Sequence, residues 1–336
     1  MPLVSVVLPA RNAAATIARA VASLQGQTFR DWELVALDDG SKDATRFILI
    51  EMAQIDPRIR VLRTKAGIAG ALNAGLAAAT GEFVARMDAD DESAPDRLEK
   101  QVAFLQAHPE LGVVGSRVEF GGDRAKSEGY ALHVDWVNSL LTPEEIHLNR
   151  FVESPFAHPS VMFRRALVHE HGAYRDGDFP EDYELWLRWM DAGVQMGKVP
   201  ETLLTWHDLP DRASRTDPRY SPEAFYKLKA FWLAEWLKRE IEAPREVWVW
   251  GAGRPTRQRA AHLTENGVRI AGYIDVDEKK SGRKVGGVPV VSPEQLPARE
   301  QAFVLGYVGT RGARDYIRAQ LDKAGRREGR DFLMCA

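Results

Sequence analysis

Two acidic clusters, each directly after an apolar run, are the residues of this chain best suited to do chemistry. Their carboxylates belong to Asp38 and Asp39 in the first cluster and to Asp88, Asp90 and Asp91 in the second. Each cluster stands where a buried strand would end, and in an open α/β sheet ligands bind at the carboxyl ends of the strands. Carboxylates that converge there repel one another unless a cation or a hydrogen-bond donor lies among them.

A divalent metal ion that holds a diphosphate is the interpretation these carboxylates favour. Hard cations bind carboxylate and phosphate oxygens together. The alternative is two solvated turns that happen to be acidic. A single cluster would fit that alternative, but a second cluster at the matching position makes it the weaker interpretation.

Alternating strand and helix patterns must position these clusters. The sequence at 4–8 is typical of a buried parallel strand, further strands are expected at 32–37, 60–62 and 83–87, and helices at 13–24, 45–52 and 69–79. Pro95 can start a further helix that reaches Gln106. This order predicts the α/β class with a right-handed, parallel, doubly wound sheet. Between 112 and 156 the periodicity weakens, and beyond it we expect a strand at 160–163 and a helix at 182–192.

Length, charge and cysteine content limit the class of protein. A chain of 336 residues is long for one core and favours two domains. The formal net charge of −3 gives no sequence-wide attraction to nucleic acid. Cys335 is the only cysteine, which excludes a disulfide within the chain and fits a reducing compartment such as the cytoplasm. No apolar run approaches the roughly 18 residues that a transmembrane helix needs.

A helix and a turn are expected to divide the chain. Residues 221–240 form an amphipathic helix with an apolar face of Phe225, Leu228, Trp232 and Trp236. We expect this face to pack against a domain, and the alternative is contact with a membrane surface or a partner. The predicted divisions are a first domain at 1–219, a connecting helix at 220–243 and a second domain at 244–336.

The second domain repeats the α/β pattern and carries a glycine-rich turn. Strands are expected at 247–250, 268–274 and 302–307, and helices at 256–266 and 311–324. Gly251 and Gly253 precede the first helix and Asp275 ends the next strand, as in a Rossmann fingerprint that admits phosphate at a helix N-terminus. Thr256 replaces the third glycine. The pattern predicts a smaller Rossmann-like domain and leaves open a second nucleotide site at Gly251, Gly253 and Asp275.

Eight blocks of sequence resemble, in the same order, those of the family 2 glycosyltransferases. They are LPARN at 8–12, SLQGQT at 23–28, DDGSKD at 38–43, GALNAG at 70–75, ATGE at 79–82, DADD at 88–91, HPSVM at 158–162 and EDYELWLR at 181–188. The resemblance covers residues 3 to 215. It implies a GT-A fold and an inverting transfer from a nucleotide-diphosphate sugar, and it does not identify the sugar.

The resemblance implies a donor site over the ends of the first strands. Asp39 matches the aspartate that accepts a hydrogen bond from the base, and Pro9 and Arg11 line the same edge. Arg11 could stack on the base through its planar guanidinium. Asn73 and Arg86 stand where the family places donor contacts, although Arg86 could equally be a structural partner of the acidic cluster. Asp38 could hold the loop by accepting backbone N–H bonds.

Asp88 and Asp90 match the family's Asp-x-Asp motif. The resemblance implies that Asp88 contacts the ribose or a metal-bound water and that Asp90 binds the metal, which is Mn²⁺ or Mg²⁺. The metal would neutralise charge on the departing nucleoside diphosphate. His207 is a candidate further ligand or diphosphate donor, and the alternative is a loop histidine held by hydrogen bonds. Asp91 is expected to be a helix N-terminal or supporting residue.

Asp182 is the candidate general base, because the family places its base in the Glu-Asp motif. Deprotonating an attacking hydroxyl opposite the leaving group needs one positioned carboxylate, and that geometry gives inversion. Glu181 would contact the acceptor or support the loop. Both acids could instead only stabilise a helix N-terminus. Arg212 and Arg215, in a closing loop at about 208–215, are candidates to clamp the diphosphate.

Together these features predict an inverting, metal-dependent glycosyltransferase. We expect a UDP-sugar donor and a hydroxyl acceptor on a glycan or a lipid-linked molecule, in bacterial surface glycan synthesis. The expected location is the cytoplasm, with a peripheral contact at the inner membrane face left open. One alternative is a catalytically silent nucleotide-sugar-binding or regulatory protein. Another is a nucleotidyltransferase, but 9–12 is not the glycine-rich phosphate loop that such an enzyme needs.

Overall fold

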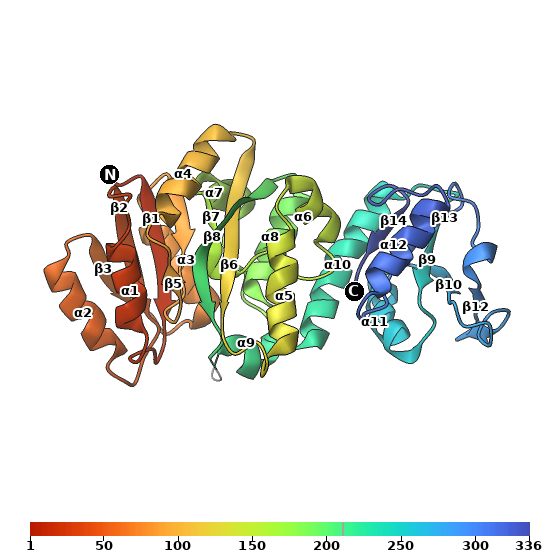
Figure 1. Cartoon of the computed structure of the whole chain (residues 1–336), viewed down its shortest axis with the longest axis horizontal. Helices are drawn as coiled ribbons and strands as arrows, with labels where there is room; N and C mark the ends of the chain where they lie inside the picture. Colours follow the sequence, from red (N-terminus) through yellow and green to blue (C-terminus); the bar gives the residue numbers. More distant parts are fainter. Residues whose placement is uncertain (210–211) are drawn as a thin grey trace. The chain divides into compact units, whose positions relative to one another are not determined.

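The computed structural model describes residues 1–209 and 212–336, and they form two compact units (Figure 1). The first unit contains Met1–Ile146 and Pro155–Asp217, and the second contains His147–Ser154 and Pro218–Ala336. The helix expected to connect two domains therefore belongs to the second unit, together with a short segment that sequence patterns did not single out. Within the described residues, no helix is long and apolar enough to cross a membrane.

The first unit is built on an eight-stranded sheet in the order β3-β2-β1-β4-β7-β6-β8-β5. Its strands are β1 (Val4–Ala10), β2 (Trp32–Asp38), β3 (Ile59–Arg63), β4 (Phe83–Arg86), β5 (Glu92–Ser93), β6 (Leu111–Gly121), β7 (Met162–Arg164) and β8 (Gln195–His207). The strands β3, β2, β1 and β4 pair in parallel, as do β6 and β8. The α/β class and the doubly wound, mostly parallel sheet are thus confirmed.

Two parts of this sheet differ from the prediction. Strand β7 is antiparallel to both β4 and β6, and β5 is antiparallel to β8. The stretch 112–156, where periodicity weakens, contains the long strand β6 and two helices. Because β7 and β5 are only three and two residues long, their direction leaves no periodic signal in the sequence.

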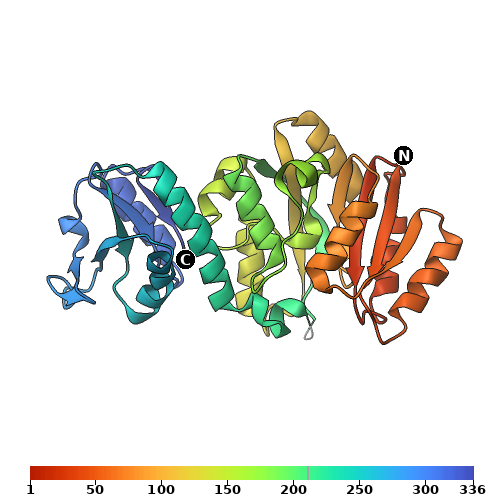
Figure 2. The same ribbon diagram turned by 180° about the vertical axis from the view of Figure 1, so that it is seen from behind.

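Helices cover both faces of the sheet. The helices in this part of the chain are α1 (Ile17–Gln25), α2 (Thr45–Ile55), α3 (Gly67–Ala78), α4 (Arg97–Ala107), α5 (Glu128–Ser139), α6 (Pro143–Asn149), α7 (Ala166–His171), α8 (Glu181–Asp191) and α9 (Ala213–Thr216). In Figure 1, α1 and α5 lie on the near face, and Figure 2 shows the opposite face with α3 and α8. Because both faces are covered, β1, β2 and β4 are buried along their whole length.

A glycine brings α3 close to the sheet. A Cβ atom on Gly75 would lie 2.5 Å from Val7 Cγ1 and 3.0 Å from Leu37 Cδ2. Any larger residue would therefore push the helix away from β1 and β2. This close packing fixes the height of Asn73, one half-turn earlier on the same helix.

The second unit is a smaller α/β unit with a six-stranded sheet in the order β11-β12-β10-β9-β13-β14. Its elements are α10 (Pro222–Glu240), β9 (Glu246–Trp250), α11 (Arg254–Glu265), β10 (Ile270–Ile274), β11 (Lys284–Val285), β12 (Val288–Val291), β13 (Ala302–Gly306), α12 (Ala313–Lys323) and β14 (Phe332–Met334). All recorded pairs are parallel except β11 with β12. The order around β9 is that of a doubly wound Rossmann-like sheet.

Helix α10 packs within the second unit, but not only through the predicted face. Leu228 is buried, whereas Phe225, Trp232 and Trp236 are half-buried. The remaining buried positions are Ala224, Lys229, Ala230, Leu233, Ala234 and Leu237. The buried face is therefore wider than the aromatic stripe, because small residues let neighbouring chain approach the helix closely.

Candidate active site

Hydrogen bonds join the loop after β1 to the loop after β2. The surface that these two loops form together is called the floor below. Asn12 has a positive φ of 52°, its amide N–H donates to Ser41 Oγ over 3.0 Å, and its Oδ1 accepts from the Lys42 amide over 2.9 Å. Ala14 N–H donates to the carboxylate of Asp43 over 3.0 Å. These bonds fix the edge of the sheet where the sequence predicts the nucleotide base.

Asp39 lies on this floor in a fixed orientation. Its Oδ1 accepts from Thr64 Oγ1 over 2.7 Å and from the Ala66 amide over 2.9 Å. Asp38 Oδ1 accepts from the Ser41 amide over 3.1 Å, which is the loop-holding contact expected of it. Pro9 is buried in β1, and Arg11 is exposed at the rim. The binding roles of Asp39, Pro9 and Arg11 stay predictions, and the structure gathers all three at one edge.

Three carboxylates converge after β4 and are called the acidic triad below. One oxygen each of Asp88, Asp90 and Asp91 lies within 4.8 Å of the other two. Asp91 Oδ1 accepts from the backbone N–H of His207 over 2.8 Å, whereas its Oδ2 is buried and has no hydrogen-bond partner among the described residues. A buried, unpartnered carboxylate oxygen beside two further carboxylates fits a divalent cation with oxygen ligands.

Electrostatics point the same way. Burial, followed by repulsion from Asp88, raises the pKa of Asp90. Burial and repulsion from both Asp88 and Asp90 raise the pKa of Asp91 well above its usual range. The triad therefore carries negative charge that the protein leaves partly uncompensated.

Asp91 does not lie at a helix N-terminus, whereas His207 forms the hydrogen bond that its alternative interpretation described. Helix α4 begins at Arg97, so Asp91 is no helix N-terminal residue and instead belongs to the triad. The ring of His207 is 2.8 Å from Glu92 Oε1. The close group of possible metal-ligand atoms among the described residues consists of the three carboxylates, without His207.

The charge of Arg212 interacts with the triad carboxylates, whereas Arg215 is paired with a different carboxylate. Arg212 donates from Nη1 to the Tyr130 hydroxyl over 2.9 Å. Burial lowers its pKa, but Tyr130 and the triad carboxylates outweigh burial and raise it. Arg215 instead forms a two-pronged pair with Asp208, with its shortest distance at 2.6 Å. Of the predicted closing loop at 208–215, residues 210 and 211 lie outside the described residues.

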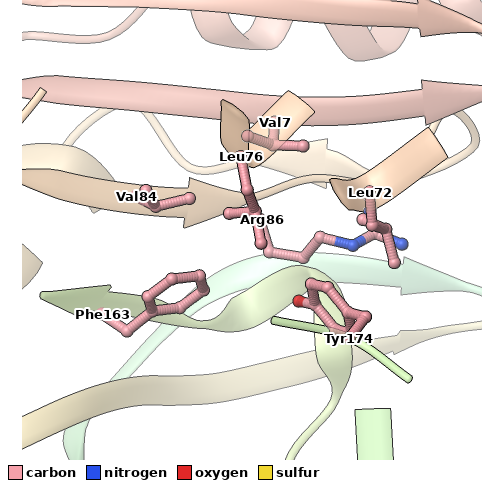
Figure 3. A pocket seen from close by; sticks show the side chains of 7 residues that line it. All are labelled: Val7, Leu72, Leu76, Val84, Arg86, Phe163 and Tyr174. Carbon is pink, nitrogen blue, oxygen red and sulfur yellow. The ribbon is translucent and has the colours of Figure 1, made fainter. Parts of the chain in front are cut away.

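Arg86 connects the triad to the helix that carries Asp182. Its Nη2 donates to Asp88 Oδ1 over 2.6 Å, and its Nη1 donates to the Met87 carbonyl. Its charge also interacts with Tyr174 and Glu181. Arg86 and Tyr174 line an apolar pocket with side chains from β1, α3, β4 and β7 (Figure 3). The pairing with Asp88 supports the structural alternative for Arg86, and a donor contact stays a prediction.

Tyr174 is buried beside Arg86. Its hydroxyl is 2.8 Å from Nε2 of His158. Burial, and then the charge of Arg86, hold the pKa of His158 well below its usual range. The imidazole is therefore neutral at physiological pH, and its hydrogen bond to Tyr174 joins two buried side chains.

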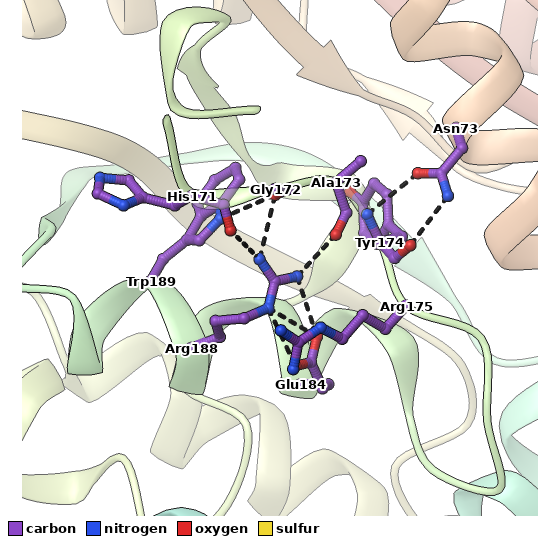
Figure 4. Close-up of polar contacts among 9 residues, drawn as sticks. All are labelled: Asn73, His171, Gly172, Ala173, Tyr174, Arg175, Glu184, Arg188 and Trp189. Carbon is purple, nitrogen blue, oxygen red and sulfur yellow. Dashed lines mark hydrogen bonds and ion pairs between the residues drawn. The ribbon is translucent and has the colours of Figure 1, made fainter. Parts of the chain in front are cut away.

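Asn73 holds the chain at Tyr174 through both ends of its side-chain amide. Its Nδ2 donates to the Tyr174 carbonyl over 2.9 Å, and its Oδ1 accepts from the Tyr174 amide over 3.0 Å (Figure 4). The amide side chain thus forms two bonds to one backbone unit. A donor contact from Asn73 would have to come in addition to them.

Arg188 on α8 holds the residues just before Tyr174. Its guanidinium donates to the carbonyls of His171, Gly172 and Ala173, and its Nε is 3.0 Å from Glu184 Oε1 (Figure 4). Trp189 Nε1 also donates to the Gly172 carbonyl, over 3.2 Å. We call this arrangement the Arg188 clamp. It ties α8 to the chain segment that contacts both α3 and Arg86.

Asp182 lies in the first turn of α8, partly exposed, with Glu181 buried beside it. Its Oδ1 accepts from the Tyr183 amide over 2.8 Å. Burial and repulsion from Glu181 raise the pKa of Asp182 to about 8. A carboxylate with a pKa near neutrality in a site of this kind is suited to accept a proton.

The glycine-rich turn of the second unit is held by hydrogen bonds from its own chain. Asp275 Oδ2 accepts from the Ala252 amide over 2.9 Å and from Lys280 Nζ over 3.0 Å. Gly251 has a φ of 109°, and a Cβ atom there would lie 2.7 Å from Val308. Gly253 stands at the N-cap of α11. The predicted Rossmann-like layout is present, and nucleotide binding by Gly251, Gly253 and Asp275 stays a prediction.

Several site residues escaped sequence reasoning. Glu184 and Arg188 carry a signal, since acidic and basic residues four apart on a helix are neighbours. Tyr130, Tyr174 and Arg19 carry none. Arg19 donates to the Asp90 carbonyl over 3.0 Å, across 71 positions of sequence.

Comparison with known proteins identifies a family whose model matches this chain. The family model described as glycosyl transferase family 2 matches residues 5–172. An amylovoran biosynthesis glycosyltransferase of Erwinia amylovora is 34% identical over 188 residues, which are 54% of this chain and 66% of that protein. A UDP-Glc:alpha-D-GlcNAc-diphosphoundecaprenol beta-1,3-glucosyltransferase of Escherichia coli is 32% identical, over 55% of this chain and 68% of that protein. The chain thus spans about two thirds of these relatives.

Solved structures share the fold. The Staphylococcus aureus TarS fragment 1–349 in complex with UDP-GlcNAc superposes with a TM-score of 0.57 at 19% identity, covering 78% of this chain and 71% of that one. The mannosyltransferase PcManGT from Pyrobaculum calidifontis, in complex with GDP-Man and Mn²⁺, gives a TM-score of 0.50 at 21% identity and covers 79% and 73%. At these identities the likeness concerns the fold alone.

Proposed function

Because the chain belongs to glycosyl transferase family 2, we propose that it transfers a sugar from a UDP-sugar to a hydroxyl group, with inversion at the anomeric carbon. The observation that carries this proposal is the acidic triad with its unpartnered Asp91 oxygen, linked through Arg86 to the helix of Asp182. The triad suits the diphosphate end of a donor. A general base on the side of the sugar opposite the leaving diphosphate suits attack by an acceptor hydroxyl.

The donor base would lie on the floor formed by the first two loops. Asp39 Oδ1 is already used by Thr64 and Ala66, which fixes the carboxylate while Oδ2 faces no recorded protein donor among the described residues. An N–H of a uracil ring is the kind of group that such an oxygen accepts. The UDP-Glc in the name of the 32% identical Escherichia coli relative supports this choice of nucleotide.

Asp88, Asp90 and Asp91 would hold a divalent cation, Mn²⁺ or Mg²⁺. A cation bound there supplies charge neutralisation for a departing diphosphate. The chain's own contribution is to hold the three carboxylates in place, through Arg86 on Asp88 and the His207 amide on Asp91. The Mn²⁺ in the PcManGT complex supports the choice of metal.

Asp182 would accept the proton of the attacking hydroxyl. Its raised pKa means that it holds a proton more readily than an ordinary aspartate does. Glu181 raises that pKa through its charge and would lie next to the acceptor. A single positioned base opposite the leaving group gives inversion.

The acceptor would be a glycan or a lipid-linked sugar in the synthesis of a bacterial surface polysaccharide. The amylovoran and diphosphoundecaprenol functions in the relatives' names support this class. For a lipid-linked acceptor we place the protein at the cytoplasmic side of a membrane.

Transfer is tested with a panel of UDP- and GDP-sugars offered with Mn²⁺. Thermal unfolding of the full chain is measured first, and the sugar that stabilises the protein is then offered with lipid-linked saccharide acceptors. We expect one UDP-sugar to raise the unfolding temperature only when Mn²⁺ is present, and the product to have inverted anomeric configuration. Stabilisation by no nucleotide sugar, or a product with retained configuration, would refute the proposal.

A further inference from the structure

Two cations of the second unit share one tyrosine ring. The Nζ of Lys229 on α10 lies 3.8 Å from the ring centre of Tyr226, and the guanidinium carbon of Arg259 on α11 lies 4.8 Å from the same centre. A cation over an aromatic face is attracted by it. Two cations at one ring also repel each other, because like charges repel. These three residues are called the Tyr226 cluster below.

The Tyr226 cluster lies at the carboxyl ends of the strands of the second sheet. Lys229 Nζ donates to the carbonyl of Cys335, just beyond β14, over 2.7 Å and to that of Val152 over 2.9 Å. Arg259 lies against the loop after β13, since a Cβ atom on Gly309 would be 2.5 Å from its Nη1. The strand order reverses between β9 and β13. In an open α/β sheet, ligands bind at the carboxyl edge where the order reverses.

No acidic side chain neutralises the Tyr226 cluster. Within the part of the chain that the structure describes, the half-buried guanidinium of Arg259 forms neither a hydrogen bond nor an ion pair. Lys229 is only 3% exposed, and its charge is held by backbone carbonyls. The charge of Glu153 reaches Lys229, but burial outweighs it and lowers the pKa of Lys229 to about 8. Buried charges are costly unless an opposite charge accompanies them, so the cluster favours an anion.

We propose that the Tyr226 cluster is a binding site for a phosphate group, carried by a small phosphomonoester or free in solution. A phosphate dianion matches two positive charges, whereas a carboxylate would leave one of them uncompensated. The guanidinium of Arg259 can donate two parallel N–H bonds to phosphate oxygens. Lys229 is buried, so it would act through its charge and not by contact.

This site differs from the glycine-rich turn of the same unit. There the Ala252 amide already donates to the carboxylate of Asp275, and that carboxylate would repel an anion. The residues of the Tyr226 cluster all belong to the second unit. No step of the proposed sugar transfer uses them, so phosphate binding would be a further property of the chain.

Equilibrium dialysis of the full chain against radiolabelled phosphate tests the site. EDTA is present so that no metal ion in the acidic triad can hold phosphate, and chloride keeps the ionic strength constant. We expect wild type to bind one phosphate with a dissociation constant on the order of 1 mM. Arg259→Met and Arg259→Gln, which remove the charge with an apolar and a polar side chain, should each weaken binding by about tenfold.

Two further variants separate charge from geometry. Arg259→Lys keeps the charge without the two parallel N–H groups, so it should lose about threefold in affinity. Arg269→Met is the matched control, because it removes an exposed arginine at the amino end of β10 in the same sheet, and it should stay within about twofold of wild type. Circular dichroism checks that each variant is folded.

Competition with unlabelled anions identifies the ligand class. Displacement of phosphate by glucose phosphate would assign the site to phosphomonoesters, and displacement by phosphate alone would assign it to the free ion. Acetate that competes as well as phosphate would overturn the assignment to a dianion. Wild-type affinity in both neutral Arg259 variants, or no binding to wild type at about 10 mM phosphate, would refute the site. UDP with Mn²⁺ should bind to Arg259→Met as to wild type, so a failure of the proposed function would leave this test intact.

Discussion

The acidic triad of the first unit and the glycine-rich turn of the second unit both lie at the carboxyl ends of parallel strands, yet their carboxylates are in opposite states. Asp91 keeps a buried oxygen that has no hydrogen-bond partner among the described residues, and burial together with repulsion from Asp88 and Asp90 raises its pKa. Burial alone would also raise the pKa of Asp275. Hydrogen bonds from the Asp277 and Ala252 amides and from Lys280 outweigh burial and lower that pKa overall. In the first site Arg86 pairs with Asp88, but the Oδ2 of Asp91 has no hydrogen-bond partner among the described residues. In the second site both carboxylate oxygens of Asp275 accept hydrogen bonds.

This difference separates a fold from a site. A Rossmann-like layout survives in the second unit because its glycines let strand and helix pack closely, which needs no ligand. The triad has no comparable structural purpose, since clustered buried carboxylates destabilise a protein unless something neutralises them. Four predictions test the contrast, from the largest expected effect to the smallest.

Replacing Asp182 with Asn should have the largest effect. The amide keeps the shape of the side chain but cannot accept a proton, so turnover should fall by roughly 10²- to 10⁴-fold, while UDP affinity stays close to wild type. Transfer rate and UDP affinity are measured on the same preparation. Near-normal transfer by Asp182→Asn would mean that Asp182 only occupies the start of a helix and is not the general base.

Breaking the Arg188 clamp should mainly cost stability. Glu184 and Arg188 are both buried. Arg188→Met leaves the Glu184 carboxylate with only the exposed Arg175 as a charged partner and removes the donor to three carbonyls, so it should lower the unfolding free energy of the first unit by about 3–5 kcal/mol. Arg175→Met is the control: Arg175 contacts the same Glu184 from an exposed position, and its loss should cost less than about 1 kcal/mol. Urea unfolding measures both variants. Equal losses of unfolding free energy in the two variants would mean that the Arg188 clamp stabilises the protein no more than the exposed Arg175 does.

The rate of transfer should depend on pH through Asp182. Its folded-state pKa of about 8 is above the ordinary value, so the protonated form is favoured in the folded protein and the basic form increases as pH rises. Turnover should therefore increase as pH rises from about 6 through 8 and level off about one pH unit above that pKa. The same shift means that ionising Asp182 lowers stability as pH rises from about 4 through 8. A turnover that is flat above pH 5 would indicate a base with an ordinary pKa.

The second unit should show the smallest effect. Because Asp275 is already bonded by its own chain, NAD⁺, NADH and NADP⁺ should not bind to the full protein at micromolar concentrations. Calorimetry with each dinucleotide checks this. Micromolar binding that is lost in Asp275→Ala would show that the turn is a working nucleotide site.

Sequence patterns located β1, β2 and β4 because strands buried on both faces are largely apolar. They also located β3, although only one of its five residues is buried. They missed β8 (Gln195–His207), since Pro200 and the exposed Glu201 interrupt its apolar pattern. They also left β6 unassigned, although it pairs with β8 along almost its whole length. Pairing between segments far apart in sequence leaves no local signal.

The same limit applies to the site. Motifs placed Asp39, Asp88, Asp90 and Asp182 at strand and helix ends, because those positions are local in sequence. The contact of Asp91 with His207 spans 116 positions, and that of Arg212 with Tyr130 spans 82. Only the fold brings these residues together, so their roles could not be predicted from spacing.

Binding of UDP in the presence and absence of Mn²⁺ tests the central claim most directly. It compares wild type, Asp90→Ala in the triad and Asp275→Ala in the second unit by calorimetry on the full chain. We expect wild type and Asp275→Ala to bind UDP equally and only with Mn²⁺, and Asp90→Ala to lose that binding. UDP affinity that is unchanged by EDTA, or that is lost in Asp275→Ala and kept in Asp90→Ala, would contradict the account.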